Sequence, residues 1–166
     1  MTKVVILLGS KSDLPVTEKG VALFKEMGIS YSLRIASAHR TPDHVHSIIT
    51  DFEQSGGQVV ICVAGMSAHL AGVVASLTTL PVLAVPVANQ ATAGLDALLS
   101  MGQMPPGIPV STMSFGSPGF QNAALTVAQI LALSDEQIGA KVRDHRRSMA
   151  EAVLGTDREN RQDFTV

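Results

Sequence analysis

The chain has 166 residues, a formal net charge of −2 and 46% hydrophobic residues, with aromatic side chains at only 4%. This length suits one compact domain, and no block of lysine and arginine is present, which excludes the usual basic footprint of a nucleic-acid-binding protein. No apolar run approaches the roughly 18 residues of a membrane-spanning helix. The first residues lead directly into a strand-like run too short for a signal peptide. We therefore expect a cytoplasmic protein with no membrane partner.

Short aliphatic runs alternate with longer segments of helical period along the chain. Strands are expected at residues 3–8, 31–36, 58–63, 81–87 and 109–113. Helices are expected at residues 16–27, 42–55, 68–77, 92–101, 119–133 and 135–154. Aliphatic runs without polar alternation are typical of parallel strands buried on both faces, and the succession of strands and helices indicates right-handed crossovers. The sequence therefore predicts a three-layer αβα sandwich with a doubly wound, flavodoxin-like parallel sheet.

The last helix is expected to be extended and to differ from the others. Ser134 and Gln137 have the spacing of a capping box at its start. A narrow stripe with a period of about 3.5 residues, typical of packing against another helix, is formed by Ile138, Val142, His145 and Met149. Its partner is either a neighbouring subunit or the chain's own sheet, and the pattern favours neither. A single α/β domain is expected to span residues 1–155, and residues 156–166 are expected to form a polar C-terminal tail.

The loop after the first strand has the composition of an anion-binding site. In an open parallel sheet, ligands bind outside the carboxyl ends of the strands. Ser10 and Ser12 offer hydroxyl groups, Lys11 offers a cation, and the following helix offers its N-terminal N–H groups. Asp13 is suited to accept hydrogen bonds from sugar hydroxyls. The alternative is a helix start capped by serine and aspartate, with a solvated lysine.

The loops after the second and third strands carry the reactive side chains. Arg40 can hold a phosphate or carboxylate with two parallel hydrogen bonds. His39, beside it, is the side-chain type suited to proton transfer near neutral pH, whereas His44 and His46 fall off the apolar face of the next helix and are expected to be solvated. His69 follows the third strand, either as a functional residue or as a satisfied structural histidine.

Metal and nucleophilic chemistry are not indicated by the sequence. No carboxylate or cysteine lies near His39 or His69 at a spacing typical of metal ligands, and no G-x-S-x-G elbow is present. The single cysteine, Cys62, lies within an aliphatic run and is expected to be a buried thiol. The residues alone thus indicate a phosphorylated small-molecule ligand, a histidine acid or base, and no cofactor.

Several segments give the chain a resemblance to a known family. The two leading motifs are residues 9–13 (GSKSD) and 37–43 (SAHRTPD). Shorter matching segments follow at residues 78–83, 85–87, 94–96, 103–105, 107–110 and 128–131. In this order they resemble the N5-carboxyaminoimidazole ribonucleotide mutases of purine biosynthesis, over roughly residues 3–150.

The resemblance implies an isomerase of IMP biosynthesis. It implies conversion of N5-carboxyaminoimidazole ribonucleotide to 4-carboxy-5-aminoimidazole ribonucleotide by release and recapture of carbon dioxide, without metal or organic cofactor. By the same resemblance Ser10, Asp13 and Arg40 bind the ribonucleotide and Ser12 and Ser37 lie near its phosphate. His39 is then the general acid/base, and His69 helps to line the carbon dioxide pocket. The resemblance also implies a homo-octamer.

The third loop departs from the family's usual Gly-Gly-Ala-Ala-His-Leu-Pro-Gly. Met66 and Ser67 follow Gly65, and Ala71 replaces a proline; residues 116–120 also differ from the usual small-residue run. A related branch carboxylates aminoimidazole ribonucleotide directly, has Lys-Gly after the first histidine and lacks the second, so Arg40 and His69 favour the mutase. The direct carboxylase, a paralogue acting on another heterocycle and a non-catalytic ligand-binding module remain as alternatives.

Overall fold

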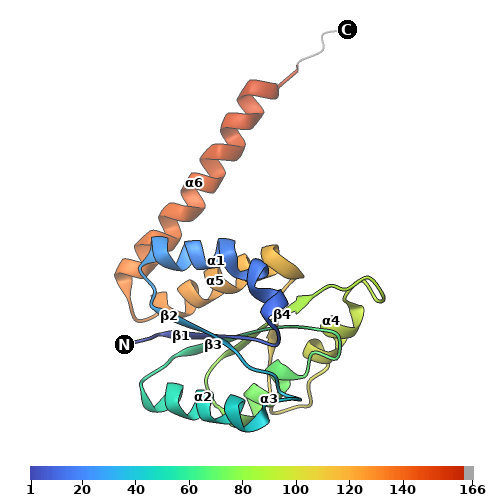
Figure 1. Ribbon diagram of the computed structural model, residues 1–166. Coiled ribbons are helices and arrows are strands. Elements are labelled where there is room, and N and C mark those ends of the chain that lie inside the picture. Colours follow the sequence, from blue (N-terminus) through green and yellow to red (C-terminus); the bar gives the residue numbers. More distant parts are fainter. Residues whose placement is uncertain (163–166) are drawn as a thin grey trace.

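The computed structural model describes residues 1–162, in which one parallel sheet lies between two layers of helices (Figure 1). Within these residues the sheet has five strands in the order β2-β1-β3-β4-β5. Their bounds are β1 Val4–Leu8, β2 Tyr31–Ile35, β3 Val59–Gly65, β4 Val82–Val87 and β5 Ser111–Thr112. All four pairings are parallel. The predicted flavodoxin-like αβα fold is confirmed.

Successive side chains of the central strands point to opposite faces of the sheet, and both faces are buried. On β1, Val4, Ile6 and Leu8 belong to one core cluster, whereas Val5 and Leu7 belong to the other. This is the two-residue period of an extended chain. Because every β1 side chain is buried, its aliphatic run shows no polar alternation. Cys62 on β3 is fully buried as expected, and burial raises the pKa of its thiol.

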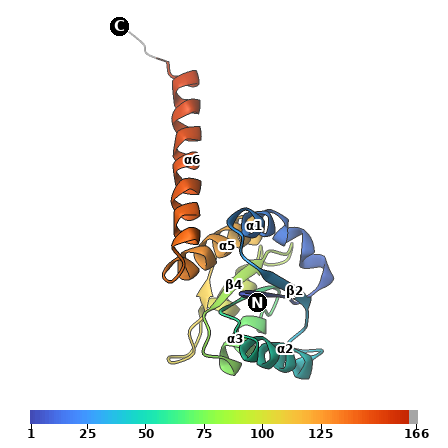
Figure 2. The ribbon, with the colours of Figure 1, turned by 90° about the vertical axis from the view of Figure 1, so that its left-hand side faces the viewer.

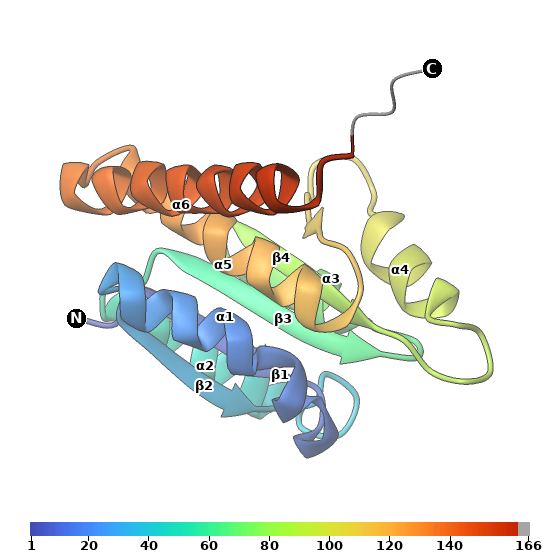
Figure 3. The ribbon, with the colours of Figure 1, turned by 90° about the horizontal axis from the view of Figure 1, so that it is seen from above.

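Helices cover each face of the sheet (Figures 1 and 2). Their bounds are η1 Lys11–Asp13, α1 Leu14–Met27, α2 Pro42–Gln54, α3 Leu70–Leu77, α4 Leu95–Gly102, α5 Gly116–Ala132 and α6 Glu136–Asn160. The helices α1 and α5 pack side by side on one face, as Figure 3 shows from above. On the other face lie α2, α3 and α4. No helix in residues 1–162 combines the length and apolarity that a membrane crossing needs.

Several helix boundaries differ from those expected. The helix α3 begins at Leu70 and α4 at Leu95, each a few residues later than predicted, because the loops before them hold local hydrogen bonds of their own. In contrast, α5 begins early, at Gly116, so that Pro118 lies in its first turn. A proline fits there, because first-turn N–H groups have no partner within the helix.

The C-terminal helix α6 rises from the body of the protein and extends beyond it (Figures 1 and 2). Its N-cap is Asp135, whose carboxylate accepts from the N–H groups of Gln137 and Ile138, so the predicted Ser134 capping box was wrong. The Asp135 carboxylate, one residue nearer the helix than Ser134, takes both donors. Residues 156–160, expected in the tail, continue the helix. Residues 163–166 of that predicted tail lie outside the described residues.

The predicted stripe on α6 divides into two halves. Ile138 and Val142 pack against the core of α1 and α5, and His145 Nδ1 lies 3.7 Å from Glu26 Oε1 on α1. Farther along, Met149 is 55% exposed and Val153 is 69% exposed. The first three residues of the stripe thus pack on the chain's own body, whereas its last residue, Met149, is more than half exposed.

Candidate functional site

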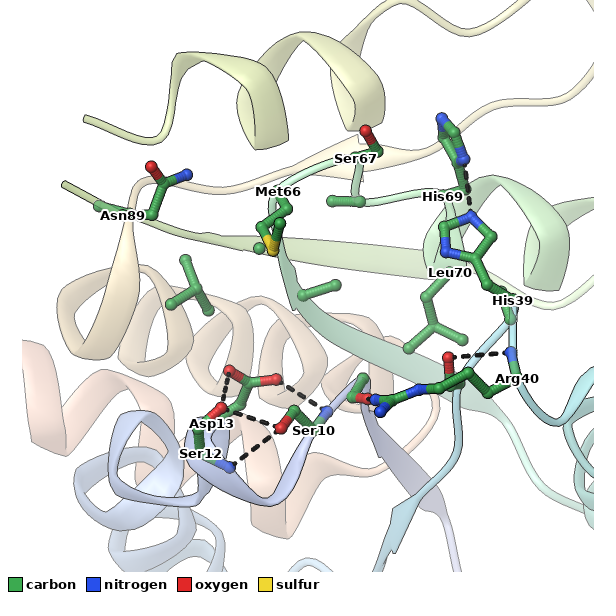
Figure 4. A pocket seen from close by; sticks show the side chains of 18 residues that line it. Ser10, Ser12, Asp13, His39, Arg40, Met66, Ser67, His69, Leu70 and Asn89 are labelled. Carbon is green, nitrogen blue, oxygen red and sulfur yellow. Dashed lines mark hydrogen bonds between the residues drawn. The ribbon is translucent and has the colours of Figure 1, made fainter. Parts of the chain in front are cut away.

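The loops at the carboxyl ends of β1, β2, β3 and β4 surround one cavity of about 660 Å³ (Figure 4). All seven predicted site residues line it: Ser10, Ser12, Asp13, Ser37, His39, Arg40 and His69. Lys11 is exposed and is not among the lining residues. The solvated pair His44 and His46 lies on the exposed side of α2, outside the cavity.

The first loop is held by its own side chains. Asp13 Oδ2 accepts from the Ser10 N–H at 3.0 Å, and Ser10 Oγ accepts from the Ser12 N–H at 3.3 Å. The Ser12 hydroxyl lies 3.0 Å from Ser10 Oγ. Asp13 is 7% exposed, and burial raises the pKa of its carboxyl group, with hydrogen bonds from Ser10 and Ser12 opposing that rise. The loop is therefore a capped helix start whose serines also border the cavity.

The second loop turns back on itself and reaches the first. Thr41 precedes α2, yet its hydroxyl does not cap that helix; it donates to Ser37 O and accepts from the Ser37 N–H. Ser37 Oγ accepts from the Arg40 N–H at 3.2 Å. The Arg40 guanidinium extends to the first loop, where Nη2 donates to Gly9 O at 3.4 Å. These contacts place a cation beside the serines of the first loop.

The two candidate histidines lie in contact. His39 Nε2 is 2.9 Å from His69 Nδ1, and their rings are perpendicular, with centroids 5.0 Å apart. One nitrogen of this contact must carry the proton that the other accepts. Both residues are exposed, so His69 is not a buried structural histidine. The pair forms one side of the cavity (Figure 4).

The third loop begins at Gly65, where the backbone lies close to β4. A Cβ built on Gly65 would lie 3.1 Å from Val87 O on β4, so the end of β3 lies close against its neighbour. Met66, the next residue, has a left-handed backbone with φ 58°. Leu70, at the start of α3, is buried and contributes an apolar side chain to the cavity.

Asn89, which the sequence pattern did not single out, also lines the cavity. Its Oδ1 accepts from the N–H groups of Ala91 and Thr92, and its Nδ2 donates to Asp96. Hydrogen bonds, the largest from the Thr92 hydroxyl, lower the pKa of the Asp96 carboxyl group. Asn89 stands just after β4, so the strand-end rule that identified the other loops would also have found it.

The cavity has the components for binding a phosphorylated ligand and moving a proton. Hydroxyl groups and a guanidinium lie on one side, and the imidazole pair on another. No group of three or more histidine, cysteine, aspartate or glutamate side chains with the arrangement of a metal site occurs among residues 1–162.

Comparison with known proteins gives consistent matches over nearly the whole chain. The model of the family described as AIR carboxylase matches residues 3–152. The N5-carboxyaminoimidazole ribonucleotide mutase of Methanocaldococcus jannaschii is 48% identical over 159 residues, covering 96% of this chain and 98% of that protein. The Escherichia coli K12 mutase of the same name is 42% identical, with 92% and 90% covered. The crystal structure of Treponema denticola PurE superposes with a TM-score of 0.88 at 33% identity, covering 96% and 98%.

Proposed function

We propose that this chain, which belongs to the AIR carboxylase family, is an isomerase of IMP biosynthesis. It converts N5-carboxyaminoimidazole ribonucleotide to 4-carboxy-5-aminoimidazole ribonucleotide, as the names of its similar relatives suggest. The observation that carries the proposal is the His39–His69 contact of 2.9 Å in a cavity shared with Arg40. A binding module has no need of a paired acid and base beside an anion-binding loop.

The reaction needs one proton in and one proton out. The carbamate N–C bond breaks, carbon dioxide leaves, and the exocyclic nitrogen keeps the electron pair and takes up a proton. The ring carbon then attacks carbon dioxide, the new C–C bond forms, and the proton on that carbon leaves. An aminoimidazole ring is electron-rich enough for this attack, so no cofactor is required. The protein must orient the ring, exclude water and handle the proton.

The phosphoribosyl group is assigned to the first two loops. Ser10, Asp13 and Arg40 hold the ribonucleotide, and Ser12 and Ser37 lie near its phosphate. The bond from Arg40 Nη2 to Gly9 O, at 3.4 Å, is long. The guanidinium can exchange it for a charged phosphate oxygen, which is the stronger acceptor. Asp13 keeps its contact with the Ser10 N–H and orders the loop around the ligand.

His39 is assigned as the general acid/base. It gives a proton to the exocyclic nitrogen and takes one from the ring carbon. His69 accepts from or donates to His39 Nε2, so it fixes the orientation of that ring, and it lines the pocket where carbon dioxide is held. Because the two transfers balance, the histidine pair ends each turnover in the state in which it began.

The proposal includes a cytoplasmic homo-oligomer, an octamer by family resemblance. The outer half of α6 supports self-association, because Met149, Val153 and Leu154 are all more than half exposed. Size-exclusion chromatography with light scattering tests this part separately. A stable monomer at micromolar concentration would contradict it.

A cofactor-free assay tests the activity. The purified protein is given freshly prepared N5-carboxyaminoimidazole ribonucleotide, and formation of the 4-carboxy product is followed. Aminoimidazole ribonucleotide with bicarbonate is run in parallel. We expect fast conversion of the first substrate and little of the second. Conversion of aminoimidazole ribonucleotide alone would make the chain a direct carboxylase. If neither substrate were converted, both the mutase and the carboxylase assignments would be wrong.

A further inference from the structure

Met66 is unfavourable where it stands for two separate reasons. Its backbone has φ 58°, a left-handed conformation that residues with a side chain adopt at a cost in free energy. Its side chain is apolar, yet the residue is 70% exposed. A glycine would remove both features. Strained residues are retained where the surroundings or the function require them. Met66 is so exposed that packing does not require a side chain there.

The position of Met66 indicates what the side chain contacts. It lines the cavity, and in Figure 4 it lies between Asn89 and the histidine pair, across from Ser10 and Asp13. Gly65, immediately before it, is held close to Val87 of β4, so Met66 projects from a firmly placed strand end. A thioether on an unbranched stem can adapt its shape to a flat ring.

We infer that Met66 is a positioning residue that covers the reacting heterocycle and holds released carbon dioxide against the ring carbon. This inference rests on the proposed function. Carbon dioxide is uncharged, so between the breaking of the N–C bond and the formation of the C–C bond, no ion pair retains it. An apolar cover retains it by excluding water. The bound ring in turn buries the methionine that the loop leaves exposed.

The chain supplies a matched control for the strain. Among the described residues, Ala93 is the one other non-glycine residue with positive φ, at 53°, and it is not among the residues that line the cavity. Both Met66→Gly and Ala93→Gly relieve a left-handed backbone. Only Met66→Gly removes a side chain from the cavity. Met66→Leu keeps an apolar side chain and the strain.

The experiment follows the carbon dioxide. Wild type and the three variants convert unlabelled N5-carboxyaminoimidazole ribonucleotide in ¹³C-bicarbonate with carbonic anhydrase present. The ¹³C content of the product reports escape and exchange, and released aminoimidazole ribonucleotide reports loss without recapture. Thermal unfolding is measured on the same samples.

We expect Met66→Gly to raise the ¹³C fraction of the product about tenfold, the factor that about 1.4 kcal/mol of lost apolar contact gives. Met66→Leu should largely restore retention, and Ala93→Gly should label like wild type. Both glycine variants should melt about 2–4 °C higher. If Met66→Gly labelled its product no more than wild type, or if Ala93→Gly gained as much ¹³C as Met66→Gly, the inference would be overturned. The proposed function would still stand. A wild-type protein that converts no substrate would overturn the proposed function, and the inference with it.

Discussion

Gly20 of α1 lies close against Phe120 of α5. A Cβ built on Gly20 would lie 2.3 Å from Phe120 Cδ1 and 3.0 Å from the Phe120 carbonyl oxygen. Phe120 is fully buried, so its ring has no free space to enter. In Gly20→Ala, the helix propensity of alanine contributes about 1 kcal/mol of stability, whereas overpacking costs about 1–3 kcal/mol. Because the Phe120 ring and the Phe120 backbone must both move, we expect an overpacking cost near the upper end of this range. The net loss in the free energy of unfolding is then about 1–2 kcal/mol.

Chemical denaturation measures this loss as the free energy of unfolding. Gly155→Ala is the matched control, because Gly155 lies within α6 and a Cβ there would meet nothing within 4 Å; this variant should be no less stable than wild type. Phe120→Leu should make room for the new methyl group, so the double variant should lose less than the sum of the single losses, by about 0.5–3 kcal/mol. A Gly20→Ala protein as stable as wild type, or strictly additive losses, would refute the packing argument.

The remaining predictions concern the site and one surface acid. His39→Asn should keep the fold and ligand affinity but remove nearly all turnover in the mutase assay; turnover within about tenfold of wild type would contradict the acid/base role. Arg40→Ala should weaken ribonucleotide binding by about 2–5 kcal/mol in calorimetry, and unchanged affinity would remove Arg40 from the site. Hydrogen bonds from Thr92 and Ala97 lower the pKa of the Asp96 carboxyl group, so its stabilising contribution is present above about pH 4 and is lost as pH falls through the lowered pKa. Asp96→Asn should therefore show a smaller decrease in melting temperature below about pH 4 than wild type, and parallel pH curves would contradict this.

The layered fold could be predicted because hydrophobic pattern and chain order both constrain it. The aliphatic run Val59–Val63 occurs in β3 with both faces buried, as a run without polar alternation requires. Gly28 ends α1 with φ 72°, a left-handed cap that a glycine adopts easily. These are local signals that the tertiary structure does not override.

The finer geometry of the site depends on contacts between loops, which a one-dimensional pattern does not contain. Thr41 stands just before α2, where a threonine often caps a helix, yet its hydroxyl bonds Ser37 instead. The contact between His39 and His69 joins residues 30 positions apart. The end of α6 was misplaced for a different reason: beyond Leu154 the residues are polar, and a polar helix that projects from the body has no apolar periodicity to reveal it.

The strand order explains why the histidine pair and the first loop border one cavity. Adjacent strands lie about 4.8 Å apart, and β1 separates β2 from β3. His39 follows β2 and His69 follows β3, so their contact at 2.9 Å joins the loops that follow the two neighbours of β1. The loop that leaves β1 carries Ser10 and Asp13. A ligand in this cavity can therefore contact both the first loop and the imidazole pair. A flavodoxin-like order thus brings the candidate binding groups and the candidate proton-transfer groups to one cavity, although they come from three separate segments of the chain.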